Sequence, residues 1–184
     1  PREMQKTLCL SVLLLLTTVC ASAAPSKTKG SSKQTLDSAA QLSLQLNERG
    51  VAAAQGRAFD QAETLFRQSL EADRHNLSAV FNLAGMYVTN RREDQAVSLL
   101  EGYAAELPNE PDLLARLGDA YFGVKKIDQA LATYQKLRVL VPKYPGIAAK
   151  LGTIFTLTNR LPDAEKAFQE AAKESPRDFQ ILAN

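Results

Sequence analysis

The sequence predicts an all-α fold in which antiparallel helix pairs stack into a solenoid. One pattern returns every 34 residues, so that Leu83 is followed by Leu117 and then by Leu151. Within each copy, apolar residues recur at the three- and four-residue spacing of amphipathic helices, and strand-like alternation is absent. A fixed period of this length, kept through four copies without insertion or deletion, indicates stacked helical hairpins.

The repeated region is predicted to span residues 38–178. Its four copies cover 43–76, 77–110, 111–144 and 145–178. In the second copy, the spacing of apolar residues predicts a first helix over 77–89 and a second helix over 93–106. The first helix of the whole region is expected to begin near Ser38.

Small residues recur where the two helices of each copy would cross. They are Gly50, Ala84, Gly118 and Gly152 in the first helices, and Ala62, Ala96, Ala130 and Ala164 in the second. Small side chains let two helices approach closely, and a larger residue would overpack the contact at a cost of about 1–3 kcal/mol. Large residues are expected to fill the space between neighbouring copies: Phe66, Leu100, Tyr134 and Phe168.

Charged residues and prolines mark the ends of the expected helices. The residues Asp60, Asp94 and Asp128 fall in the first turn of the second helices, where a negative charge suits the positive helix end. Prolines close the second helices at Pro108, Pro142 and Pro176. Because proline is tolerated at the first helical position, Pro111 and Pro145 are expected to open the helices that follow.

This pattern resembles the tetratricopeptide repeat family from residue 43 to about 178. The second to fourth copies are close to the family pattern. The first copy departs from it at Arg49, Ala53 and Arg74, where a large apolar residue, an aromatic residue and a proline are usual. Terminal units of solenoids are commonly atypical, so the first copy is still counted. The resemblance implies a right-handed superhelix whose first helices line a concave groove for an extended peptide or a helix.

The resemblance also implies which residues line that groove. They are Asn47, Val51, Phe81, Asn82, Gly85, Arg116, Asp119, Lys150 and Thr153. Three of them, Asn82, Arg116 and Lys150, share one phase and are expected to form a polar-to-basic ladder beside an aromatic side chain. Some family members clamp a C-terminal carboxylate with such residues. Asn82 and Arg116 match that clamp, whereas Asp112 stands where a lysine would be needed.

The residues before the repeats predict export. A short basic start precedes the apolar run Leu8–Val19, and Ala21-Ser22-Ala23 fits a cleavage site, so residues 1–23 are predicted to be a secretory signal peptide. Residues 24–37 are predicted to be a flexible Ser- and Lys-rich linker. The apolar run is shorter than the about 20 residues of a membrane-spanning helix. The alternatives are an uncleaved anchor and lipid attachment at Cys20, although the residues before Cys20 fit lipidation poorly.

No catalytic or cofactor-binding constellation emerges from the sequence. His75 is the single histidine, whereas a metal site needs several converging ligands. The glycines lack the spacing of phosphate-binding loops. Residues 43–178 carry 17 Lys and Arg against 18 Asp and Glu, which is not the basic footprint of nucleic-acid binding. We therefore expect no metal, no cofactor and no nucleic-acid partner.

These observations predict a non-enzymatic scaffold or adaptor of the bacterial periplasm or cell envelope, with a protein or peptide partner. The alternative is an interaction module of a longer envelope protease or cell-wall enzyme, whose catalytic domain would lie beyond Asn184. A third hypothesis, a tethered chaperone, depends on lipidation of Cys20. Residues 179–184 begin like a further helix, so the chain is expected to continue.

Overall fold

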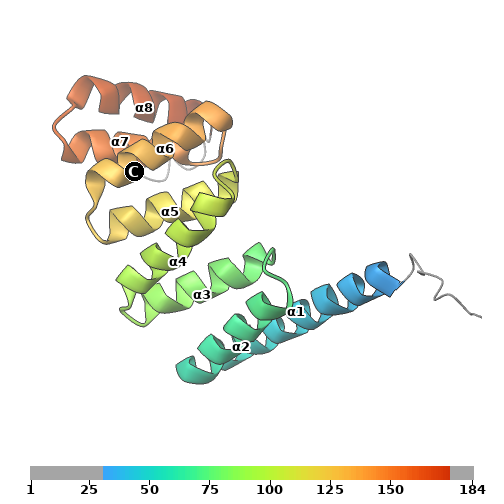
Figure 1. Cartoon of the computed structure of the whole chain (residues 1–184). Helices are drawn as coiled ribbons and strands as arrows, with labels where there is room; N and C mark the ends of the chain where they lie inside the picture. Colours follow the sequence, from blue (N-terminus) through green and yellow to red (C-terminus); the bar gives the residue numbers. More distant parts are fainter. Residues whose placement is uncertain (1–30, 175–184) are drawn as a thin grey trace, which may run out of the picture.

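The chain folds into a stack of helical hairpins. Its structure is a computed structural model that describes the backbone of residues 31–174 and the side chains of residues 37–174. Between these limits the chain forms helices only: α1 (Ser31–Gln55), α2 (Phe59–Ala72), α3 (Leu77–Thr89), α4 (Glu93–Glu106), α5 (Pro111–Gly123), α6 (Ile127–Leu140), α7 (Ile147–Leu157) and α8 (Leu161–Glu174). Successive helices pack against one another along the whole stack (Figure 1). The predicted all-α solenoid is thereby confirmed.

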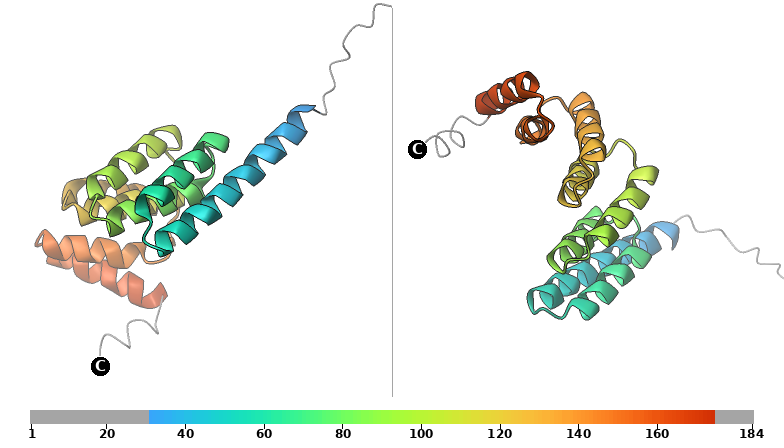
Figure 2. Two further views of the ribbon diagram at one scale, coloured as in Figure 1. Left: turned by 90° about the horizontal axis from the view of Figure 1, so that it is seen from below. Right: turned by 90° about the vertical axis from the view of Figure 1, so that its left-hand side faces the viewer.

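The odd-numbered helices, here called the A helices, occupy one side of the stack and the even-numbered B helices the other. Neighbouring A helices contact one another, α1 with α3 and α3 with α5. No pair of B helices in the described part packs to the same extent. The stack therefore curves with its A helices on the inner side, as the views in Figure 2 illustrate.

The helix limits follow the sequence pattern closely, and two of them differ from it. The predicted helices 77–89 and 93–106 are α3 and α4. Helix α1 begins at Ser31, earlier than the expected start near Ser38, so residues 31–37 are helical and not flexible linker. The physical reason is that no glycine or proline interrupts these residues, and a helix propagates easily from an already packed segment. The N-terminal part of α1 extends past α2 (Figures 1 and 2).

The second difference concerns the start of α7. Pro111 does open α5, as predicted. Pro145 does not open α7, which begins at Ile147. Between them, Gly146 adopts a φ of 75°, a left-handed conformation that an α-helix cannot contain.

Several expectations lie outside the described residues. They are the secretory signal over 1–23, the linker up to residue 30, the proline at 176 and the further helix at 179–184. Within the part of the chain that the structure describes, no helix is both long and apolar enough to cross a bilayer.

Aromatic rings lying on glycines hold the two helices of a repeat together. A Cβ atom added to Gly50 would lie 2.6 Å from the ring of Phe66, and one added to Gly152 would lie 2.8 Å from the ring of Phe168. The ring of Tyr134 covers Gly118 in the same way. Each ring thus packs on the glycine of its own repeat. Phe66 and Leu100 also line spaces between neighbouring copies, where these large residues were expected.

Cations lie over aromatic rings on the A helices at the same place in three repeats. In each case the cation lies in the turn that follows an A helix, and the aromatic residue lies five positions earlier, near the end of that helix. The arrangement therefore recurs with the 34-residue period of the sequence. The distances to the ring centroids are 4.7 Å for Arg92 and Tyr87, 5.9 Å for Lys126 and Tyr121, and 4.5 Å for Arg160 and Phe155. Such contacts contribute about 0.5–1 kcal/mol each where solvent reaches them.

At the first junction between repeats, a carboxylate extends this arrangement. Glu63 of α2 accepts hydrogen bonds from the Tyr87 hydroxyl at 2.8 Å, from Arg92 at 2.7 Å and from Arg67 at 3.0 Å. Burial raises the pKa of Glu63, but these hydrogen bonds and the charge of Arg92 outweigh burial and lower the pKa from 4.5 to about 2. The ionised carboxylate therefore stabilises the contact between the first and second repeats.

The first repeat contains buried polar contacts in addition to apolar ones. The Asn76 side chain donates to the Ser43 hydroxyl at 2.8 Å, and the Ser69 hydroxyl donates to the Ser43 carbonyl oxygen at 2.7 Å. These three residues are buried. Arg74, at the position of the usual proline, forms an ion pair with Glu106 of α4. The first repeat is thus joined to the second by directional bonds.

The glycine–ring contact predicts the effect of added methyl groups. We expect Gly118→Ala to lower the free energy of unfolding by about 1–3 kcal/mol, because its Cβ would overlap the Tyr134 ring. The control Gly102→Ala should raise it by up to about 1 kcal/mol, because Gly102 is helical with open space around it. Urea unfolding followed by far-UV circular dichroism measures both, and equal effects would contradict the contact.

The Glu63 network predicts a pH dependence of stability. Because the folded-state pKa lies below the usual 4.5, the stabilisation is present above that pH and is lost as the pH falls toward 2. At neutral pH, we expect Glu63→Gln to lower the free energy of unfolding by about 1–2 kcal/mol. The difference between the two proteins should shrink as acid is added. Urea unfolding at a series of pH values tests this, and a pH-independent difference would rule it out.

Candidate functional site

All nine residues expected to line a groove lie on α1, α3, α5 and α7, the A helices. Asn82, Arg116 and Lys150 occupy the same position on α3, α5 and α7, as their shared phase predicts. The side chains nevertheless differ in what they contact, so each helix contributes differently to the surface.

At the N-terminal end of the inner face, two amides bond to each other. The Asn82 side chain donates to the Asn47 side-chain oxygen at 2.9 Å, which joins α3 to α1. Asn47 is buried, with 9 % of its surface exposed, so it lies beneath the face and supports Asn82. Val51 lies nearby and lines a depression of about 260 Å³ together with Asn82, Phe59 and Phe66.

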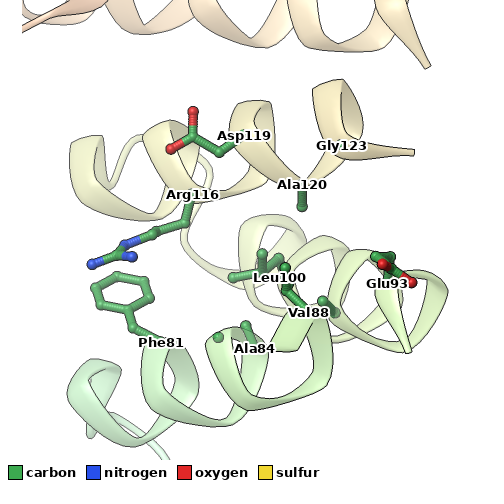
Figure 3. Close-up of a pocket in the computed structure, with 11 residues that line it drawn as sticks. Phe81, Ala84, Val88, Glu93, Leu100, Arg116, Asp119, Ala120 and Gly123 are labelled. Carbon is green, nitrogen blue, oxygen red and sulfur yellow. The ribbon is translucent and has the colours of Figure 1, made fainter. Parts of the chain in front are cut away.

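In the middle of the face, Arg116 stacks on an aromatic ring. Its guanidinium carbon lies 5.3 Å from the centroid of Phe81, so α5 and α3 meet through a cation–π contact (Figure 3). Arg116 is exposed and forms no ion pair within residues 31–174. Its charge is therefore available to an anionic group of a partner.

Toward the C-terminal end, the charges are already paired. Asp119 accepts a hydrogen bond from the Tyr134 hydroxyl at 2.5 Å and forms an ion pair with Lys150. Burial raises the pKa of Tyr134, and the bond to Asp119 raises it further, so the phenol stays protonated. The exposed Thr153 donates its hydroxyl to the backbone oxygen of Ala149 at 3.1 Å. This part of the face is locally neutral.

A pocket of about 240 Å³, here called the central pocket, lies between the second and third repeats. Ala84, Ala96 and Leu100 line it from the second repeat, and Ala120 and Gly123 line it from α5 of the third. Phe81 and Arg116 stand at one end, and Val88 and Glu93 at the other.

Seven residues that line the central pocket were not among those expected from the resemblance. They are Ala84, Val88, Glu93, Ala96, Leu100, Ala120 and Gly123. The signal that could have found them is the difference between repeats, since several of these positions hold larger or more apolar residues elsewhere in the stack. A family pattern describes what the copies share and passes over such differences.

The described residues offer no arrangement for catalysis by a metal. No group of three or more His, Cys, Asp or Glu side chains converges within this part of the chain. His75 lies in the α2–α3 turn, where its backbone N–H donates to the Asp73 carboxylate at 2.9 Å.

Two family models decide the relationship of the chain to known proteins. Both describe the tetratricopeptide repeat, and they match residues 52–117 and 115–179. The chain belongs to the tetratricopeptide repeat family. Together the two matches run from the first repeat to the fourth and agree with the four-copy register. No curated protein sequence matches the chain significantly.

Solved structures of other tetratricopeptide repeat proteins share the fold. A MamA structure from Desulfovibrio magneticus RS-1 is 20 % identical, covers 80 % of this chain and 87 % of its own, and has a TM-score of 0.62. MamA from AMB-1 is 23 % identical, with 70 % of each chain covered and a TM-score of 0.57. The first tetratricopeptide repeat domain of Spaghetti (RPAP3), bound to the HSP90 peptide SRMEEVD, is 22 % identical, covers 65 % of this chain and 95 % of its own, and has a TM-score of 0.57.

The two bonds of Asp119 predict that loss of Asp119 lowers the stability of the fold more than loss of Lys150 does. We expect Asp119→Ala to lower the free energy of unfolding by about 1–2 kcal/mol, because the buried Tyr134 hydroxyl loses its charged acceptor. Lys150→Ala should cost less than about 0.5 kcal/mol, because the ion pair is exposed and the tyrosine bond remains. Urea unfolding compares them, and a larger loss for Lys150→Ala would contradict the assignment.

Proposed function

We propose that the chain is a non-enzymatic interaction scaffold or adaptor that binds an acidic or polar segment of a partner protein on its inner face. The observation that carries the proposal is Arg116, an exposed cation held over Phe81 with no ion-pair partner in the described structure. A rigid ring beneath a free guanidinium is an arrangement that suits a carboxylate or a carbonyl group of a bound segment.

The other charges of this face favour the same polarity. Asp112 accepts a hydrogen bond from the Tyr144 hydroxyl at 2.7 Å, and Asp119 is bonded by Tyr134 and Lys150. Both carboxylates near Arg116 thus accept hydrogen bonds from the protein, and Asp119 is also paired with a cation. The charge that lies directly over Phe81 is the positive one of Arg116, which supports an acidic partner.

Membership in the tetratricopeptide repeat family supports peptide binding in general. The structural neighbour from Spaghetti is bound to a peptide, SRMEEVD, that carries three acidic residues. The shared fold supports the same mode of binding here, on the inner face of the A helices.

For the location we propose the bacterial periplasm or cell envelope. The support is in the sequence alone: the apolar run Leu8–Val19 followed by Ala21-Ser22-Ala23 fits a cleaved secretory signal. An exported adaptor would meet its partner among the components of an envelope assembly.

A double variant tests the inner-face assignment. We expect Phe81→Ala combined with Arg116→Glu to abolish capture of the partner, because it removes the ring and reverses the unmatched charge. Pull-down from an envelope extract with immobilised full-length chain is the measurement, and circular dichroism should show unchanged helicity. The matched control is Lys136→Glu on the B helix α6, which should capture as the wild type does. Undiminished capture by the double variant would refute the assignment.

A further inference from the structure

At the junction that holds the central pocket, the second and third repeats carry smaller residues than the two neighbouring junctions do. The differences lie at three positions that face the same space. Leu100 stands in place of Phe66, Tyr134 and Phe168; Ala120 in place of Met86 and Ile154; Gly123 in place of Thr89 and Leu157. Since the register is constant, these residues occupy equivalent places in the stack. The central pocket thus has smaller residues at these three positions than the equivalent positions of the neighbouring junctions.

The depression between the first and second repeats is the equivalent space, and it is shallower. There the ring of Phe66 forms the floor, and neither Gly50 nor Ala62 beneath it lines the space. In the central pocket the corresponding Ala84 and Ala96 are both part of the lining. The central pocket therefore reaches down to the crossing of its two helices, where the other repeats place a ring.

The size and lining of the central pocket suit a bulky apolar side chain. An apolar cavity of roughly 150 Å³ in another protein binds benzene, and the central pocket measures about 240 Å³. Alanine, leucine and glycine residues form much of its lining. Transfer of an apolar side chain from water into such a space is favourable, because apolar surface is removed from water.

The two ends of the pocket differ in charge. Arg116 stands at one end above Phe81, without an ion-pair partner. Glu93 stands at the other end, where the first, third and fourth repeats have Phe59, Ile127 and Leu161. No ion pair or hydrogen bond engages the Glu93 side chain within residues 37–174. A bound segment would find a cation on one side of its buried side chain and a carboxylate on the other.

We propose that the central pocket is an anchoring site for one bulky apolar side chain of an acidic peptide segment, with an acidic neighbour of that side chain pairing with Arg116. The proposal rests on the proposed function and adds a specific subsite to it. The carboxylate of Glu93 repels an acidic residue on the other side of the buried side chain. The pocket should therefore distinguish a peptide whose acidic residues precede the apolar one from a peptide with the reverse order.

Three matched peptides test the chemistry of the occupant. The probes are acetylated heptapeptides: Gly-Glu-Glu-Phe-Ser-Gly-Ser, the same peptide with alanine for phenylalanine, and the reversed order Ser-Gly-Ser-Phe-Glu-Glu-Gly. Binding to the full-length chain is followed by methyl chemical shifts in NMR titrations. We expect one of the two phenylalanine peptides to shift the methyl signals of Ala84, Leu100 and Ala120, and to bind at least about tenfold tighter than the alanine peptide.

A variant that fills the pocket tests its location. Ala84→Gly combined with Leu100→Phe gives the second repeat the glycine–ring pair that the first and fourth repeats already contain. We expect this filled variant to remain helical and to bind the preferred peptide at least about tenfold more weakly. The control is the opposite exchange in the first repeat, Gly50→Ala with Phe66→Leu, which leaves the central pocket unchanged. Ala120→Met, which introduces the residue found at Met86, fills the pocket by a second route should the first variant not fold.

Different outcomes separate this proposal from the function beneath it. Equal binding by both filled variants, with shifts confined to other parts of the inner face, would overturn the anchoring site and leave the proposed function standing. Equal affinity for the phenylalanine and alanine peptides would also overturn it. No saturable binding of any acidic peptide to the wild type would overturn both.

Discussion

The close approach of two helices at a glycine is the constraint on which the whole stack depends. A ring lies directly on the backbone of Gly50, Gly118 and Gly152, where any side chain would occupy the same space. This contact sets the distance between the A and B helices within a repeat. Core packing is dense, so a change of one methyl group at this contact is felt.

The second repeat shows what happens when the constraint is relaxed. Ala84 replaces the glycine and Leu100 replaces the ring, so both partners of the contact change together. The helices still pair, but the volume that a ring occupies in the other repeats is left open toward the inner face. A repeat protein can therefore create a binding site by leaving out one part of its own core, without adding any element to the fold.

The architecture could be predicted from the sequence because it is repeated. The limits of α3 and α4 were obtained from apolar spacing, charged first turns and prolines, and each signal occurs in several copies. The start of α7 could not be predicted, because it depends on the left-handed backbone of Gly146. The other copies have no glycine at this position. The same reason explains the site. Arg116 and Phe81 follow from the shared pattern, whereas Leu100 and Glu93 matter through their difference from the other repeats.

Contacts between side chains were beyond the sequence for a further reason. The phase of Asn47 and Asp119 places both on the A helices, but only the three-dimensional arrangement shows that Asn82 covers the first and that Lys150 neutralises the second. A helical period predicts the face on which a residue lies. It does not predict which neighbours satisfy its hydrogen bonds, and that decides whether a polar group is available to a partner.

The early start of α1 makes this helix a rigid spacer at one end of the molecule. Its first buried residue among the described side chains is Ser43, 12 residues after the helix begins at Ser31 (43 − 31 = 12). At a rise of 1.5 Å per residue this is roughly 18 Å of rod projecting from the stack. Hydrogen bonds from Ser69 and Asn76 hold its base in a fixed direction. The first turns of α1 therefore extend the described molecule beyond α2, away from the other repeats (Figures 1 and 2).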